Sequence, residues 1–231
     1  MAFQGCTPPA SSPRWHVRED TLMGTTVRIE IFSDDPVKVR QQFDRVSHEM
    51  RRLENLLSAF IEESDVVRLN RLASVSPVKV APETFEVISN SIQISKITGG
   101  AFDITYESVG YLYDFRNPAM PSSEEIEHRI EAVDYRLIEL SPNINTIFFK
   151  DSRVRINLGG IAKGYVVDKC MELLMESGAT RALVNAGGDS RILGDRVGRP
   201  WQIGVQHPRR PGSIATSIPI LDASVSTSGD Y

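Results

Sequence analysis

The stretch Val154-Arg155-Ile156-Asn157-Leu158-Gly159-Gly160-Ile161-Ala162-Lys163-Gly164-Tyr165 is the most informative part of the chain. Its first five residues predict a strand, and a helix with Lys163 in its first turn follows the glycine pair. Glycines let a ligand approach the backbone, and the N–H groups at a helix N-terminus attract anions. The stretch therefore suits a phosphate or pyrophosphate, although its spacing is neither GxGxxG nor GxxxxGK. The alternative is a plain tight turn with a surface lysine.

Three more glycine-rich turns accompany this one. They are Gly99–Asp103, which closes a helix, and Asn185–Asp189 and Ser226–Asp230, which both follow apolar strands. Each alone is an ordinary turn, in which glycine supplies a positive φ and aspartate bonds its own backbone. Together they offer backbone donors and carboxylates, a combination that suits a nucleotide with a divalent cation.

The periodicity of the remaining chain predicts an α+β fold. Residues 26–31 alternate as a strand with one buried face. The apolar residues of a long helix that starts at Pro36 step by four and three positions: Val39, Phe43, Val46, Met50, Leu53 and Leu57. Further long helices are predicted from Pro82 to Gly99 and from Gly160 to Gly178. We expect mixed or antiparallel sheets packed with these three long helices.

Shorter elements are predicted between the long helices. Ser122 to Glu125 fits a capping box, and the helix that follows is expected to bury Ile126, Ile130 and Val133. Further strands are predicted at the following residues: 136–140, 146–149, 154–158, 182–185, 201–205, 214–221 and 223–226.

Composition excludes several classes of protein. The 231 residues are 41% hydrophobic and 24% charged, with 2 Cys, which is ordinary globular composition. The net charge of −4, without a basic patch, argues against a nucleic-acid partner. No apolar run reaches the roughly 18 residues of a membrane span. The four histidines show no metal-ligand spacing, and no catalytic Ser/His/Asp or Cys/His arrangement can be identified.

The N-terminal residues resemble the end of a bacterial lipoprotein signal. Gly5-Cys6 precedes a stretch rich in proline and serine, so we expect residues 1–19 to be a clipped signal remnant and tether, with Cys6 lipidated. This predicts a lipoprotein on the periplasmic side of the inner membrane in the bacterial cell envelope. The alternative is a cytoplasmic protein with a free thiol. Cys170 lies in an apolar helical pattern and is expected in the core.

A series of motifs resembles the ApbE family of FAD:protein FMN transferases and covers residues 20–231, which we expect to form one flavin transferase domain. In chain order the motifs are Met23-Gly24-Thr25, Ser58-Ala59-Phe60, Ser64–Asn70, Gly99–Asp103, Asn157–Asp168, Asn185–Asp189, Trp201–Val205 with Pro208, and Ser226–Tyr231. The resemblance implies an enzyme that cleaves the FAD pyrophosphate, joins FMN through a phosphoester to a threonine of an acceptor flavoprotein, and releases AMP. It also implies Mg²⁺ as the metal.

The resemblance further implies which residues bind. The residues expected to contact FAD are Met23, Phe60, Ala101, Phe102, Asp103, Asn157 and Lys163. The backbone carbonyl of Gly160 is expected to be one Mg²⁺ ligand. The turn that the residues alone assign to a phosphate is thus the turn that the resemblance assigns to the pyrophosphate.

Two departures from the family pattern bear on activity. The family usually has aspartate at position 157, where this chain has asparagine, so nucleotide binding is expected to be weaker. The family also continues beyond Tyr231 into the segments that carry the catalytic residues and complete the metal site. We therefore expect the C-terminal part of the domain to be missing and this piece to be weak or inactive, with its catalytic residues unknown. The alternatives are a non-catalytic flavin-binding lipoprotein and an FAD pyrophosphatase that gives FMN and AMP.

Overall fold

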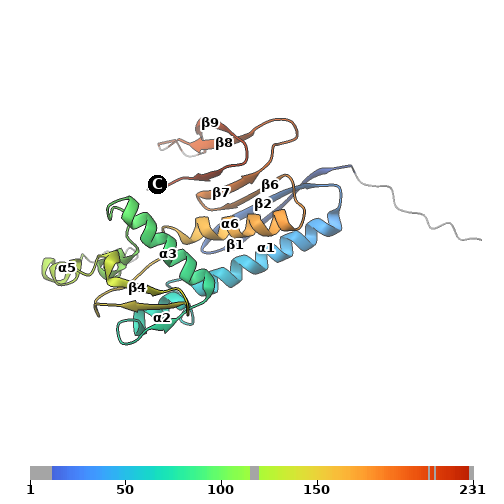
Figure 1. Cartoon of the computed structure of the whole chain (residues 1–231). Helices are drawn as coiled ribbons and strands as arrows, with labels where there is room; N and C mark the ends of the chain where they lie inside the picture. Colours follow the sequence, from blue (N-terminus) through green and yellow to red (C-terminus); the bar gives the residue numbers. More distant parts are fainter. Residues whose placement is uncertain (1–11, 115–119, 208, 211, 229–231) are drawn as a thin grey trace, which may run out of the picture. The chain divides into compact units, whose positions relative to one another are not determined.

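The computed structural model describes residues 12–114, 120–207, 209–210 and 212–228 (Figure 1). The chain divides into two compact units, where unit 1 comprises residues 1–51 and 166–231 and unit 2 comprises residues 52–165. The sequence predicted one domain and did not indicate this division. Cys6, Pro208 and residues 229–231, which belong to the predicted motifs, lie outside the described residues.

Unit 1 contains an antiparallel sheet of five strands. In spatial order these are β1 (Arg14–Leu22), β2 (Thr25–Ser33), β6 (Ala182–Ala186), β7 (Asp189–Leu193) and β10 (Ser224–Ser226). β1 pairs with β2 from Arg14 opposite Ser33 to Leu22 opposite Thr25. The expected tether therefore ends earlier than residue 19, and this prediction was wrong for residues 14–19. The signal was weak because β1 buries only Leu22 fully, so its side chains show no clear apolar alternation.

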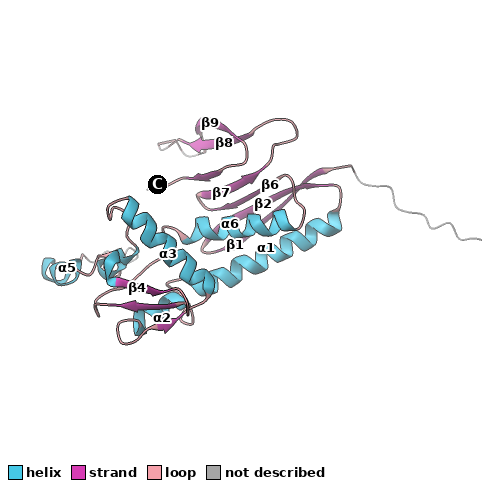
Figure 2. Ribbon diagram, in the orientation of Figure 1, coloured by secondary structure: helices cyan, strands magenta, loops and turns pink. Residues whose placement is uncertain are grey.

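Two long helices cover one face of this sheet, α1 (Pro36–Leu57) and α6 (Ala162–Glu176) (Figure 2). All six apolar residues predicted to line α1 are buried, which confirms the helical periodicity. Gln42 Nε2 of α1 donates to Ser177 Oγ at 2.9 Å, just after the end of α6. Cys170 is buried in this core as expected, and burial raises the pKa of its thiol to about 12.

The opposite face of the sheet carries a second apolar cluster. The strands β8 (Trp201–Gln206) and β9 (Ile214–Ile220) form an antiparallel pair. Trp201 of β8 is 3% exposed and clusters with Leu183 and Ile192 of the sheet. Side chains of successive strand residues point to opposite faces, so Leu183 lies on the face away from its neighbour Val184. The sheet is therefore covered on both faces.

Unit 2 contains helices around a small antiparallel sheet. Its helices are α2 (Asp65–Leu72), α3 (Pro82–Ile97), α4 (Glu107–Gly110) and α5 (Ser123–Ile130), with 3-10 turns at Ile104–Tyr106 and Tyr135–Leu137. Its sheet has the spatial order β3 (Val78–Lys79), β5 (Thr146–Phe149) and β4 (Ile138–Ser141). The three long helices and the α+β class are thus confirmed.

A buried carboxylate joins α2 to α3. Asp65 is 4% exposed, and its Oδ2 accepts hydrogen bonds of 2.8 Å from the Ala81 backbone N–H and from the Thr84 hydroxyl. Its Oδ1 accepts from Arg68 at 2.8 Å. A buried charge is tolerated when it is paired and hydrogen-bonded in this way.

Residues 154–158 form no strand in any of the described sheets, so the predicted strand was wrong. The backbone N–H of Ile156 donates to Asn70 Oδ1 at 2.8 Å, and Asn70 Nδ2 donates to the Ile156 carbonyl at 2.9 Å. The neighbouring groups are also satisfied locally, because Arg155 N–H donates to Ser108 Oγ at 3.0 Å and Asn157 N–H donates to the Ile104 carbonyl at 3.0 Å. Side chains and the carbonyl of a 3-10 turn residue replace the partner strand that buried backbone normally needs.

The prediction for α5 was right in its capping and wrong in its buried face. Ser122 and Glu125 form the expected capping box. Ile130, however, is 52% exposed, and Ile126 and Val133 are only partly buried. The helix ends at Ile130, so Val133 lies beyond it and does not continue its face.

We expect Asn70→Asp to lower the free energy of unfolding by about 2 kcal/mol, because it removes the donor to the Ile156 carbonyl and places a carboxylate against it. Urea denaturation measures this change. The control is Asn90→Asp, at an exposed position of α3, for which a change within about 0.5 kcal/mol is expected. Equal midpoints for the two variants would contradict the proposed role of Asn70.

Candidate functional site

The glycine turn of unit 2 leads directly into α6. The Leu158 carbonyl accepts from the N–H groups of Ile161 and Ala162, at 3.0 and 2.7 Å, which closes the turn around Gly159 and Gly160. Both glycines are exposed. Lys163 in the first helical turn is partly exposed and makes no hydrogen bond or ion pair with any described residue. The helix N-terminus and this cation favour an anion at the same place.

The loop Ala101–Asp103 comes close to this turn. A Cβ atom at Gly160 would lie 3.3 Å from Cε2 of Phe102, so the ring packs against the Gly160 backbone. Asp103 holds the loop, since its Oδ1 accepts from Thr105 N–H at 2.8 Å and its Oδ2 from Tyr135 N–H at 2.8 Å. Ala101 is exposed beside Phe102. Two of the predicted motifs are therefore brought together.

Asn157 connects the turn to α4. Its Oδ1 accepts from Gly159 N–H at 2.8 Å, and its Nδ2 donates to Glu107 Oε2 at 3.2 Å. Burial raises the pKa of Glu107, and the hydrogen bond from Asn157 and the charge of Arg155 partly offset that rise. The pKa of Tyr106 is also raised, first by burial and then by the adjacent Glu107 carboxylate. A half-buried carboxylate with a raised pKa is typical of functional sites.

The other two predicted FAD contacts are Phe60, in the same unit, and Met23, in the other unit. Phe60 is 92% exposed and makes no ring contact with any described residue. Met23 belongs to unit 1, where it has a φ of 54° in the turn between β1 and β2 and precedes Gly24, with a φ of 68°. A long side chain at positive φ is uncommon, and such strained positions concentrate at functional sites.

In unit 1 the Met23-Gly24-Thr25 turn lies beside the turn between β6 and β7. Gly187 N–H donates to the Thr26 carbonyl at 3.0 Å, and a Cβ at Gly187 would lie 2.8 Å from Thr25 Oγ1. The end of β10 joins them, because Thr227 N–H donates to the Gly188 carbonyl at 2.9 Å. Three motifs that are far apart in sequence therefore meet at one end of the five-stranded sheet.

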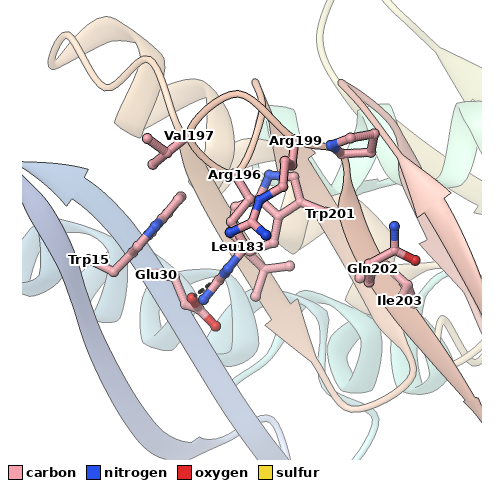
Figure 3. Close-up of a pocket in the computed structure, with 10 residues that line it drawn as sticks. Trp15, Glu30, Leu183, Arg196, Val197, Arg199, Trp201, Gln202 and Ile203 are labelled. Carbon is pink, nitrogen blue, oxygen red and sulfur yellow. Dashed lines mark hydrogen bonds and ion pairs between the residues drawn. The ribbon is translucent and has the colours of Figure 1, made fainter.

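A separate cavity of about 880 Å³ lies in unit 1 (Figure 3). The guanidinium of Arg196 packs against both Trp15 and Trp201, with its Cζ 4.7 and 4.6 Å from the ring centroids. The two rings also contact each other edge to face, with centroids 4.9 Å apart. Buried Glu30 accepts from Arg196 at 2.8 Å and from Arg28 at 2.9 Å. The positive charge of Arg196 is thus already neutralised by a carboxylate and stabilised by two indole rings. None of the ten lining residues belongs to the predicted site.

Neither a metal cluster nor a membrane helix is present in the described part of the chain. No three His, Cys, Asp or Glu side chains converge there on a point that could hold a metal ion. None of the helices in those residues is long and apolar enough to cross a bilayer.

The fold and the glycine turns define a class, an α+β protein with an exposed glycine turn at a helix N-terminus. The chain belongs to the ApbE family, whose sequence model matches residues 23–231. It is 29% identical to the FAD:protein FMN transferase of Vibrio cholerae, over all of this chain and 70% of that protein. It is 26% identical to the FAD:protein FMN transferase of Treponema pallidum, over 94% of this chain and 65% of that protein.

Solved structures agree with this assignment. The ApbE protein of Thermotoga maritima superimposes with a TM-score of 0.86 at 32% identity, over 94% of this chain and 71% of that one. The flavinyl transferase ApbE of Pseudomonas stutzeri, in its apo form, gives a TM-score of 0.84 at 25% identity, over 94% of this chain and 69% of that one. The chain spans about two thirds of the length of the curated relatives that it matches.

Sequence reasoning missed two residues that shape this site, Glu107 and Asn70. Asn70 ends a motif that the sequence analysis quoted, yet no local pattern tells which backbone its amide will bind. Glu107 directly follows the 3-10 turn, and no motif included it. Both act through contacts between residues 50 and 86 positions apart, which a periodicity cannot show.

We expect Glu107→Gln to gain stability relative to the wild type as pH rises from about 4 to about 7. The raised pKa of Glu107 means that its contribution to stability is fully present below the unfolded pKa and is lost as pH rises through the folded pKa. Gln keeps an acceptor for Asn157 and does not titrate. Urea midpoints in a pH series measure the difference.

The matched control for this series is Glu127→Gln, which changes the net charge equally at an exposed position of α5. A wild type that gained stability over Glu107→Gln with rising pH would contradict the prediction. It would show that attraction to Arg155 outweighs the burial of the carboxylate.

Proposed function

We propose that this chain binds FAD at the Gly159-Gly160 turn and transfers FMN to an acceptor flavoprotein. The acceptor is a threonine hydroxyl, whose oxygen forms a bond to the FMN phosphorus. The pyrophosphate bond to the adenylate breaks, AMP leaves, and the hydroxyl proton is released. Membership of the ApbE family and the names of the relatives support this activity. The observation that supports this location is the close packing of the Phe102 ring on the Gly160 backbone. Lys163 follows three residues later, and its side chain pairs with no described residue.

The chain's own residues bind and orient the donor in this proposal. The two glycines expose backbone to the pyrophosphate, since side chains there would meet Asn157 Oδ1 at 3.1 Å and the Phe102 ring at 3.3 Å. Lys163 neutralises phosphate charge. The ring of Phe102 offers a flat apolar surface to the bound nucleotide. These groups lower the cost of holding a charged pyrophosphate at a protein surface.

Mg²⁺ fits this site if the substrate supplies part of its coordination shell. The Gly160 carbonyl would be one oxygen ligand, and phosphate oxygens would supply others, which is a common way for proteins to hold Mg²⁺. When bound, the ion would neutralise charge on the phosphates. The described residues contain no three-carboxylate cluster that would hold it without substrate.

The test uses the whole chain with FAD, Mg²⁺ and a threonine-containing acceptor, and measures FAD affinity, AMP release and covalent flavin on the acceptor. We expect Gly160→Ala to weaken FAD binding about tenfold, because the added Cβ displaces the Phe102 ring from the turn. Gly164→Ala is the matched control. It has open space around it and ordinary helical backbone, so binding should be unchanged and stability equal or higher.

The possible products separate the alternatives. Flavin joined to the acceptor together with AMP supports the transferase. Free FMN with AMP would identify an FAD pyrophosphatase, and saturable binding without AMP would identify a non-catalytic flavin-binding protein. A wild-type chain that does not bind FAD would overturn the proposal.

We also propose that the protein is a lipoprotein anchored through Cys6 on the periplasmic side of the inner membrane. The Gly5-Cys6 pair and the prolines and serines that follow it support this location. Mass spectrometry of the N-terminal peptide from the native cell is expected to show a diacylglyceryl group on Cys6. An unmodified thiol in that peptide would contradict the anchor and leave the cytoplasmic alternative.

A further inference from the structure

We propose that Glu107 is a positioning residue for the glycine turn, and that it acts through the Asn157 amide. The proposal goes deeper into the flavin site and rests on the function proposed above. Three groups stand in line, with the Glu107 carboxylate accepting from Asn157 Nδ2 at 3.2 Å and Asn157 Oδ1 accepting from Gly159 N–H at 2.8 Å. One end of this line is α4, and the other is the backbone that the ligand would approach.

The two ends of the line allow only one orientation of the amide. An N–H donor faces Oδ1, and a carboxylate, which only accepts when ionised, faces Nδ2. Rotating the amide by half a turn would place oxygen against oxygen at Glu107 and nitrogen against nitrogen at Gly159. The carboxylate therefore fixes Oδ1 toward the turn, and the fit is tight, since a Cβ at Gly159 would lie 3.1 Å from Oδ1.

The described groups around Glu107 do not compete with Asn157 for its carboxylate. The charged group acting on it is Arg155, whose own guanidinium stacks on Tyr111 with Cζ 4.6 Å from the ring centroid. Tyr106 precedes Glu107 in sequence, and both side chains lie close to Gly110. A Cβ at Gly110 would lie 3.0 Å from the Tyr106 ring and 3.4 Å from Glu107 Oε2. The side-chain hydrogen bond that acts on this carboxylate comes from Asn157.

This arrangement makes positions 107 and 157 interdependent. Aspartate at position 157 would set two carboxylates about 3 Å apart, and like charges at that distance disfavour ionisation of both. Glutamine at position 107 would remove the conflict, because its amide can donate to the carboxylate introduced at position 157 while that carboxylate still accepts from Gly159. The chain is thus built for an amide at 157 because it has a carboxylate at 107.

The experiment is a double-mutant cycle with two measurements, FAD affinity and exchange of the Gly159 amide hydrogen. The variants are Glu107→Ala, Glu107→Gln, Asn157→Asp and the double variant E107Q/N157D, with Glu127→Ala on α5 as the control. Exchange of the Gly187 amide in unit 1, which bonds to Thr26 at 3.0 Å, is the internal reference. Amide exchange needs no ligand, so it tests the positioning role even if FAD fails to bind and the proposed function fails.

We expect Glu107→Ala to speed exchange at Gly159 about tenfold and to weaken FAD binding by a similar factor, with Glu107→Gln within about twofold of wild type. Asn157→Asp should weaken binding about tenfold, and Glu107→Gln should recover most of that loss only in the Asn157→Asp background. Unchanged exchange at Gly159 in Glu107→Ala, or the same effect of Glu107→Gln in both backgrounds, would overturn the proposal. Exchange at Gly187 separates these results from a change in overall stability.

Discussion

The two hydrogen bonds between the Asn70 amide and the backbone of Ile156 hold the segment on which the site of unit 2 depends. Ile156 is fully buried and pairs with none of the described strands, so its N–H and carbonyl need partners from elsewhere. The Asn70 amide turns one of its N–H donors and its oxygen toward this backbone, and it can therefore take the place of a strand residue. The segment enters the glycine turn with a fixed direction, and α6 starts from that turn.

The same arrangement explains why this region is not a sheet. A partner strand would cover one edge of residues 154–158 along its whole length. Single side chains from α2 and α4 satisfy the backbone instead, and Ser108 both accepts from Arg155 N–H and donates to its carbonyl. The backbone beyond Asn157 consequently enters the Gly159 turn, which stays exposed. Side chains from the helices thus satisfy the backbone of this segment and leave the glycine turn uncovered, whereas a longer partner strand would cover it.

The sequence predicted those features that depend on local periodicity or on turn chemistry. The steps of four and three in α1 fix which residues face the core, and the glycine turns appear where they were expected. The apolar pattern of Val154–Leu158 predicted burial correctly, but it cannot distinguish a strand partner from an amide 86 positions away. For the same reason, nothing in the sequence pointed to Glu107. β1 failed as a prediction because Val17 is exposed, the partly buried His16, Arg18 and Asp20 are polar, and only its last residue is fully buried.

The cluster of Trp15, Arg196 and Trp201 has a consequence for tryptophan fluorescence. Both tryptophans of the chain lie in unit 1, whereas five of its six tyrosines lie in unit 2. The two indoles are 4.9 Å apart, and a guanidinium packs on each, so their emission responds to the opening of this one cluster. Tyrosine signals report on the other unit. The molecule therefore carries separate spectroscopic reporters for its two halves, and these can show whether the halves unfold in one transition or in two.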